Sequence, residues 1–185
     1  MAGPDLIDQA KRGDPRAFEE LVRPCLDVAF RTAYLITHDA EDARDAAQTA
    51  LIKVHGAIGR FRRDEPFRPW LLAIVANEAK NLVRSRVRRR TEPWPNAGEP
   101  ATAGDDDPLA EIVTRERSAW LVAHINRLDT NDRIAIYSRY ALDLTELEMA
   151  AVLDCPRGTV KSRLHRAIGR LRARIDAEQQ EEARS

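Results

Sequence analysis

An eighteen-residue segment rich in proline, glycine and acidic residues divides this chain. Residues 91–108 read TEPWPNAGEPATAGDDDP and hold four of the ten prolines, two glycines and five carboxylates. Such a composition buries too little apolar surface to fold, and it favours an extended chain that repels itself. The sequence therefore predicts two small domains, at residues 1–90 and 115–176, joined by a flexible linker at 91–114 and followed by a tail at 177–185.

Both domains are predicted to be helical, which makes the fold all-α. Hydrophobic residues are 43% of the chain but aromatic ones only 5%, so the cores must be mainly aliphatic. Apolar residues recur at steps of three and four, the period of an amphipathic helix. We expect helices over 15–36, with a kink at Pro24, and over 39–58 and 69–90. In the second domain we expect helices over 115–128 and 130–142, with Trp120, Leu121, Ile125, Ile134, Ile136 and Tyr137 in the core.

The helix over 69–90 carries two different faces. Leu71, Val75, Ala79 and Leu82 fall together as a core face. A second stripe combines a ring for stacking, amides for base edges and guanidiniums for phosphates, as in proteins that bind single-stranded nucleic acid; its members are Trp70, Asn77, Asn81, Arg84 and Arg88. The alternative is a partly buried Trp beside ordinary surface residues.

The end of the chain predicts a helix-turn-helix. Thr145 and Glu148 match a capping box that begins a short helix. After the turn at residues 154–156, a helix to about Ile175 packs inward through apolar residues, and its N-terminal end is the part that enters the major groove in this motif. The alternative is a helix-turn-helix used only for protein contacts. Its outward side chains include Lys161, Ser162, His165 and Arg166.

Charge is concentrated in two basic segments although the formal net charge is zero. Residues 60–90 have ten basic and three acidic side chains, a net of +7, and residues 154–175 have seven and one, a net of +6. Each segment coincides with one of the two candidate nucleic-acid surfaces. We therefore favour binding of a polyanion over the alternative of two solvated helix faces.

Enzymatic motifs are missing from the sequence. The four histidines have no H-E-x-x-H spacing, and no Walker-type or dinucleotide-binding glycine pattern occurs. Cys25 and Cys155 lack zinc or disulfide spacing, so we expect them to be buried small side chains. No secretory signal or membrane-spanning run is visible. We predict a cytoplasmic binding protein with no catalytic residues, no metal, no cofactor and no membrane insertion.

The chain resembles the extracytoplasmic-function (ECF) group of the sigma-70 family of bacterial RNA polymerase sigma factors, the subunits that give core polymerase its promoter specificity. The resemblance covers most of the chain and lies in GDPRAFEELV, DAEDARDAAQTALIKVHGAIGRF, FRPWLLAIVANEAKNLVRSRVRRR and LTELEMAAVLDCPRGTVKSRLHRAIGRLR. It implies that the first domain corresponds to sigma region 2 and the second to region 4. It also implies core RNA polymerase, through its clamp helices and flap, promoter DNA and an anti-sigma factor as partners.

The resemblance also implies roles for particular residues. The helix over 39–58 would dock on the clamp helices through Asp45, Gln48 and Lys53. The loop at residues 60–67 and the next helix would bind the minus-ten element as a single strand, with Asn77 holding a flipped base; the implied residues are Arg60, Phe61, Phe67, Trp70, Asn77, Asn81, Arg84 and Arg88. The minus-thirty-five duplex would meet Thr159, Lys161, Ser162, Arg163, His165 and Arg166.

Several positions depart from the family pattern, and other functions stay open. Ala47, Leu51 and His55 stand where relatives often have larger aliphatic or aromatic residues, which would alter polymerase affinity. One alternative function is a helix-turn-helix regulator that binds duplex DNA without polymerase, although no heptad seam for dimerisation is visible. Another is an adaptor that sequesters a regulator, which would not need the Asn77 stripe.

Overall fold

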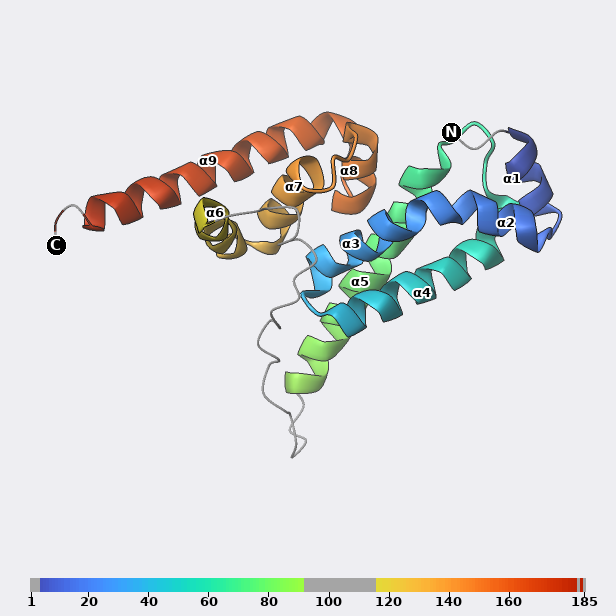
Figure 1. Cartoon of the computed structure of the whole chain (residues 1–185), viewed down its shortest axis with the longest axis horizontal. Coiled ribbons are helices and arrows are strands. Elements are labelled where there is room, and N and C mark those ends of the chain that lie inside the picture. The colour runs from blue at the N-terminus through green and yellow to red at the C-terminus, as the bar shows by residue number, and fades with distance from the viewer. Residues whose placement is uncertain (1–3, 92–115, 183, 185) are drawn as a thin grey trace. The chain divides into compact units, whose positions relative to one another are not determined.

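The computed structural model describes residues 4–91, 116–182 and 184, and these residues form helices and turns without a strand. The chain separates into two compact units, Met1–Thr102 and Ala103–Ser185 (Figure 1). The all-α prediction is confirmed. The predicted linker at 91–114 lies outside the described residues, except that Thr91 is the last residue of a helix.

The first unit begins with a helix that the sequence analysis did not predict. Asp14 caps the next helix, since its carboxylate accepts hydrogen bonds from the backbone N–H groups of Arg16 and Ala17. The predicted kink at Pro24 is a 3₁₀ turn between two helices. The elements are α1 (Pro4–Lys11), α2 (Pro15–Val22), η1 (Arg23–Cys25) and α3 (Leu26–Thr37).

Three packed helices form the core of this unit: α3, α4 (Ala40–Ala57) and α5 (Phe67–Thr91). The 3₁₀ turn η2 (Ile58–Arg60) follows α4, and α5 begins at Phe67, ahead of the predicted start at Pro69. Small residues on α4 allow a close approach between the helices. The buried side chains include Leu35, Ala46, Ala50, Val54, Leu71, Leu72, Val75 and Ala79. Cys25 is buried as predicted, whereas Cys155 of the second unit is only half-buried, so its predicted burial was wrong.

The second unit contains α6 (Glu116–Asn126), α7 (Thr130–Tyr140), α8 (Glu146–Leu153) and α9 (Arg157–Glu182). The predicted capping box is confirmed: the Thr145 hydroxyl accepts from the Glu148 N–H, and the Glu148 carboxylate accepts from the Thr145 N–H. Asp154 ends α8 in the left-handed conformation and leads into α9. Helix α9 runs past the end predicted near Ile175 and includes the first part of the predicted tail.

The core of the second unit differs from the prediction on α6. Trp120 and Leu121 are 44% and 38% exposed, so their assignment to the core was wrong. Among the described side chains of α6, which begin at Trp120, His124 and Ile125 are the buried ones. The remaining predicted core residues are confirmed, and the buried set includes Ile134, Ile136, Tyr137, Leu144, Met149, Val152, Val160 and Ala167.

Two polar pairs join α9 to its neighbours. Arg170 donates to both carboxylate oxygens of Asp132 on α7, and this hydrogen bonding holds the pKa of the Asp132 carboxyl below its ordinary value. Glu178 accepts from His124 on α6, which lowers the pKa of Glu178.

Within the described parts of the chain, no helix is both long and apolar enough to cross a bilayer.

Candidate nucleic-acid interface

The predicted stripe on α5 is exposed except at Trp70, which is half-buried. Asn77, Asn81, Arg84 and Arg88 are exposed, whereas on the core face Leu71, Val75 and Ala79 are fully buried and Leu82 is half-buried. The helical period thus separates the two faces as the sequence indicates. Amide and guanidinium groups follow one another over three turns at the surface, an arrangement that suits base edges and phosphates.

Arg86 belongs to a different face of α5. Its guanidinium lies 2.5 Å from the carboxylate of Asp42, which is buried on α4. Burial raises the pKa of Asp42, and the charge of Arg86 opposes that effect. One cation of the RSRVRRR run therefore joins α4 to α5.

Phe61 and Phe67 form an aromatic cluster with Trp70. Ring centroids are 5.7 Å apart between Phe61 and Phe67, and those rings lie 4.7 and 5.7 Å from the Trp70 ring. The two phenylalanines are only 3% and 8% exposed. Both rings pack against the half-buried Trp70 ring, and their predicted part in binding the minus-ten strand stays a prediction.

A small hollow lies beside this cluster in the basic loop between η2 and α5. It is lined by Ala57, Arg60, Phe61, Arg62, Glu65 and Trp70. Arg62 donates to the Asp64 carboxylate at 2.7 Å, and this hydrogen bond lowers the pKa of Asp64. Part of the positive charge of the loop is thus offset within the loop. The hollow combines an aromatic wall with a charged rim, which suits a planar ring attached to a phosphate.

Helix α4 places the predicted docking residues at the surface, with one apolar residue that the sequence analysis missed. Asp45 and Gln48 are exposed, and Ile52, one turn after Gln48 on the same face, has 67% of its surface exposed. This face lies opposite the buried alanines of α4, so the helical period of the sequence could have identified Ile52. Lys53 is exposed at the edge of this face, where its ammonium donates to the Glu78 carboxylate of α5 at 2.6 Å.

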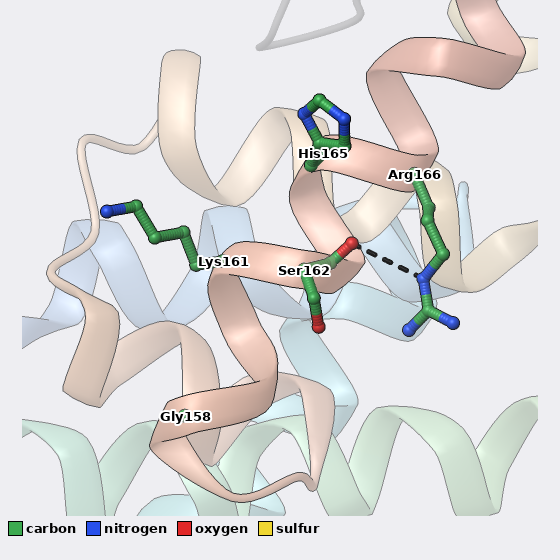
Figure 2. A pocket seen from close by; sticks show the side chains of 5 residues that line it. All are labelled: Gly158, Lys161, Ser162, His165 and Arg166. Carbon is green, nitrogen blue, oxygen red and sulfur yellow. Dashed lines mark hydrogen bonds between the residues drawn. The ribbon is translucent and has the colours of Figure 1, made fainter.

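The second candidate surface is the N-terminal part of α9 (Figure 2). Gly158, Lys161, Ser162, His165 and Arg166 line one open depression, and all five are exposed. The Arg166 Nε donates to the Ser162 carbonyl at 3.3 Å. The Ser162 hydroxyl donates to the Thr159 carbonyl at 3.0 Å. The structure thus brings the predicted outward side chains together on one face.

Thr159 and Arg163 lie at the side of this face and are half-buried. Arg163 donates to the backbone carbonyl of Leu153 at 3.2 Å, which connects α9 to the end of α8. The two helices of the motif are therefore fixed to each other close to the outward face. Thr159 and Arg163 contribute to the geometry of the turn.

Comparison with known proteins decides the family. The model of Sigma-70 region 2 matches residues 21–89, and that of Sigma-70 region 4 matches residues 118–171. RNA polymerase sigma-H factor of Pseudomonas aeruginosa is 35% identical over 169 residues, covering 88% of each chain. The chain belongs to the extracytoplasmic-function group of the sigma-70 family. ECF RNA polymerase sigma-E factor of Escherichia coli is 32% identical over 171 residues, again covering 88% of each chain. This protein is an RNA polymerase sigma factor.

Solved structures agree with the fold of this sigma factor. CnrH, in complex with the cytosolic domain of CnrY, has a TM-score of 0.67 at 26% identity, covering 96% of this chain and 99% of that chain. The sigma factor RpoE of Bartonella quintana, in complex with the anti-sigma factor NepR, has a TM-score of 0.62 at 22% identity, covering 86% and 96%. The second likeness supports the fold.

Proposed function

We propose that the two units read different promoter elements when the sigma factor is bound to core RNA polymerase. The first unit binds the minus-ten element as a single strand, and the second binds the minus-thirty-five element as duplex. The observation that carries this proposal is the pair of surfaces, one on α5 and one on α9, each within a basic segment. Each surface alone offers only a few contacts, so joint attachment to polymerase supplies the remaining affinity.

At the minus-ten element, the α5 stripe and the adjoining loop receive the separated strand. Extruding a base costs a few kcal/mol of stacking and pairing, and contacts to the extruded base offset that cost. The Asn77 amide both donates and accepts hydrogen bonds, so it suits a base edge. Trp70 supplies a ring for stacking, while Arg84 and Arg88 meet phosphates. Asn81 extends the polar stripe, and Arg60 lies at the rim of the hollow.

At the minus-thirty-five element, the N-terminal part of α9 enters the major groove. Lys161 and Arg166 provide hydrogen-bond donors for guanine. Of the two, only Arg166 has a planar guanidinium that can bind guanine through two parallel N–H groups. Ser162 and His165 complete the outward face, and His165 gives this sigma factor a preference of its own. Thr159 and Arg163 act at the flank of the helix, where Arg163 also holds the carbonyl of Leu153.

Polymerase docking is assigned to α4 in the first unit. Asp45 and Gln48 face outward with Ile52, and this mixture of polar and apolar groups is typical of a protein interface. Lys53 takes part at the edge of this surface, next to Glu78. The polymerase clamp helices are the partner of this surface, and the flap is the partner of the second unit.

Regulation and location follow from the same function. CnrH was solved in complex with the cytosolic domain of CnrY, and RpoE in complex with the anti-sigma factor NepR. We extend this to the present chain, whose activity an anti-sigma protein would control. It acts by binding, with no catalysis of its own, and it works in the cytoplasm where polymerase and promoters meet.

Gel filtration with purified core polymerase tests the proposed function. We expect the full chain to co-elute with core enzyme at moderate salt, and to retain a promoter fragment only when core enzyme is present. Failure to co-elute, together with tight promoter binding by the free chain, would establish the alternative of a regulator that works without polymerase.

A further inference from the structure

Helix α1 is in direct contact with the loop that borders the minus-ten surface. The Lys11 ammonium donates a hydrogen bond to the backbone carbonyl of Phe61 at 2.9 Å, and the Asp8 carboxylate forms an ion pair with Arg63. Helix α1 also packs on η2, which leads into the loop. The region 2 match begins at residue 21, so α1 lies ahead of the matched segment.

Phe61 is the residue at which the chain changes direction. Its backbone N–H donates to the Ile58 carbonyl at the end of η2, and its φ of −62° and ψ of 135° begin the loop that follows. The Phe61 ring packs against Trp70 and forms a wall of the hollow. A shift of the Phe61 carbonyl would therefore move both the Phe61 ring, which packs against Trp70, and the loop segment that carries Arg62.

Lys11 fixes that carbonyl from outside the core. A hydrogen bond from an ammonium to a carbonyl is stronger than one between neutral groups, and it is half-buried here, where water competes less. The ion pair of Asp8 with the half-exposed Arg63 is worth less, because solvent screens it. Lys11 is thus the principal contact of α1 with the loop, and Asp8 is an auxiliary one.

We propose that Lys11 is a positioning residue for minus-ten recognition, which acts by holding the Phe61 carbonyl and so the shape of the hollow beside Trp70. This inference rests on the proposed function, because it assigns the loop to promoter reading. It adds α1 to the recognition machinery: the helix contacts the loop and reaches DNA only through it. The expected consequence is a change in sequence preference that exceeds any change in folding.

The test compares Lys11→Met, Lys11→Arg and the neighbouring Arg12→Met in holoenzymes assembled with core polymerase. Open complexes are selected from a promoter library randomised only in the minus-ten element and then sequenced. We expect Lys11→Met to reduce discrimination between preferred and disfavoured sequences by on the order of tenfold, the scale of one lost charge-assisted hydrogen bond. Lys11→Arg should restore most of it. Arg12 is exposed, so its variant should behave as wild type.

Thermal unfolding and co-elution with core polymerase accompany the selection. Unchanged discrimination in Lys11→Met would overturn the inference, and so would an equal loss of opening at every minus-ten sequence, which indicates a purely structural role. If Lys11→Met does not fold, Asp8→Asn serves as the second variant, with a smaller relaxation expected and an unchanged preference counting against the idea. If the wild-type chain together with core polymerase opens no promoter, that result would instead contradict the proposed function itself.

Discussion

Asn77 and Trp70 lie on the same helix but differ in their burial. The Asn77 side chain is exposed on α5, and nothing in the core of the unit depends on it. Trp70 is half-buried on Phe61 and Phe67, so its ring orientation is set by the fold. A change at Asn77 therefore reports on promoter contact, whereas a change at Trp70 would combine packing with contact.

The first prediction concerns Asn77→Ala. Promoter opening should fall by about tenfold, because the extruded base loses a hydrogen-bonding partner in the open complex. Polymerase binding should be unchanged. Permanganate reactivity of unpaired thymines measures the opening, and Asn131→Ala, an exposed asparagine on α7, is the matched control. Wild-type reactivity in Asn77→Ala on a linear promoter would exclude Asn77 from the interface.

At the scale of the elements, local chemistry predicted the helix starts well. Asp14, Asp39 and Thr145 each cap a helix with a side-chain oxygen, and Asp and Thr are residue types that favour the N-cap position. Boundaries set by tertiary packing were less predictable. Helix α1 is short and gains its stability from contacts with α2 and η2, which no local pattern shows.

The burial of single aromatic residues was also difficult to predict from the sequence. Phe61 and Phe67 lie at the two ends of a basic loop, and the structure buries both rings against Trp70, which the sequence did not indicate. Their contact with DNA stays a prediction. Trp120 shows the reverse case: its periodicity suggested the core, but its ring lies at the surface against His124. Periodicity identifies a helix face, whereas the neighbours that cover that face come from distant segments.

The capping box of α8 supports a second prediction. Thr145→Ala removes the hydroxyl that accepts from the Glu148 N–H, and it should reduce the free energy of unfolding of the second unit by about 1 kcal/mol. Thr145→Ser keeps the hydroxyl and should be close to wild type. Urea unfolding of the full chain measures the difference. Equal stabilities for the alanine and serine variants would show that the cap contributes nothing.

The pair between α7 and α9 supports a third prediction, on acid stability. Because the pKa of folded Asp132 is below its ordinary value of 3.8, the ionised pair stabilises the fold above about pH 4. That contribution is lost as the pH falls through the lowered pKa. Asp132→Asn should therefore destabilise the second unit at pH 7, and the gap from wild type should narrow below about pH 4.

Unfolding midpoints of wild type and Asp132→Asn, recorded from pH 7 down to pH 3, measure that gap. Asp176→Asn is the control, since Asp176 is an exposed carboxylate on the same helix, α9. A gap that stays constant over this range would show that the charge of Asp132 does not contribute. The partner of Arg170 follows from the packing of α7 against α9 and not from any local pattern in the sequence.

At the scale of the whole molecule, the chain consists of two units with separate cores and separate basic surfaces. A substitution in one unit can therefore impair recognition of one promoter element and leave recognition of the other element unchanged. Substitution of Arg166 tests this separation of the two reading functions most directly. The Arg166 guanidinium lies on the outward face of α9, and Arg166→Lys keeps the positive charge but removes the planar fork. A forked contact with guanine contributes about 1 to 3 kcal/mol of discrimination at one base pair.

The decisive measurement is open-complex formation by the Arg166→Lys and Arg166→Ala holoenzymes on promoters randomised only in the minus-thirty-five element, then only in the minus-ten element. Wild type and Asn77→Ala are run beside them. Arg166→Lys should relax the upstream preference at one position and leave the downstream preference unchanged, whereas Asn77→Ala should do the reverse. A change in the downstream preference caused by either Arg166 variant would contradict the account of two independent readers.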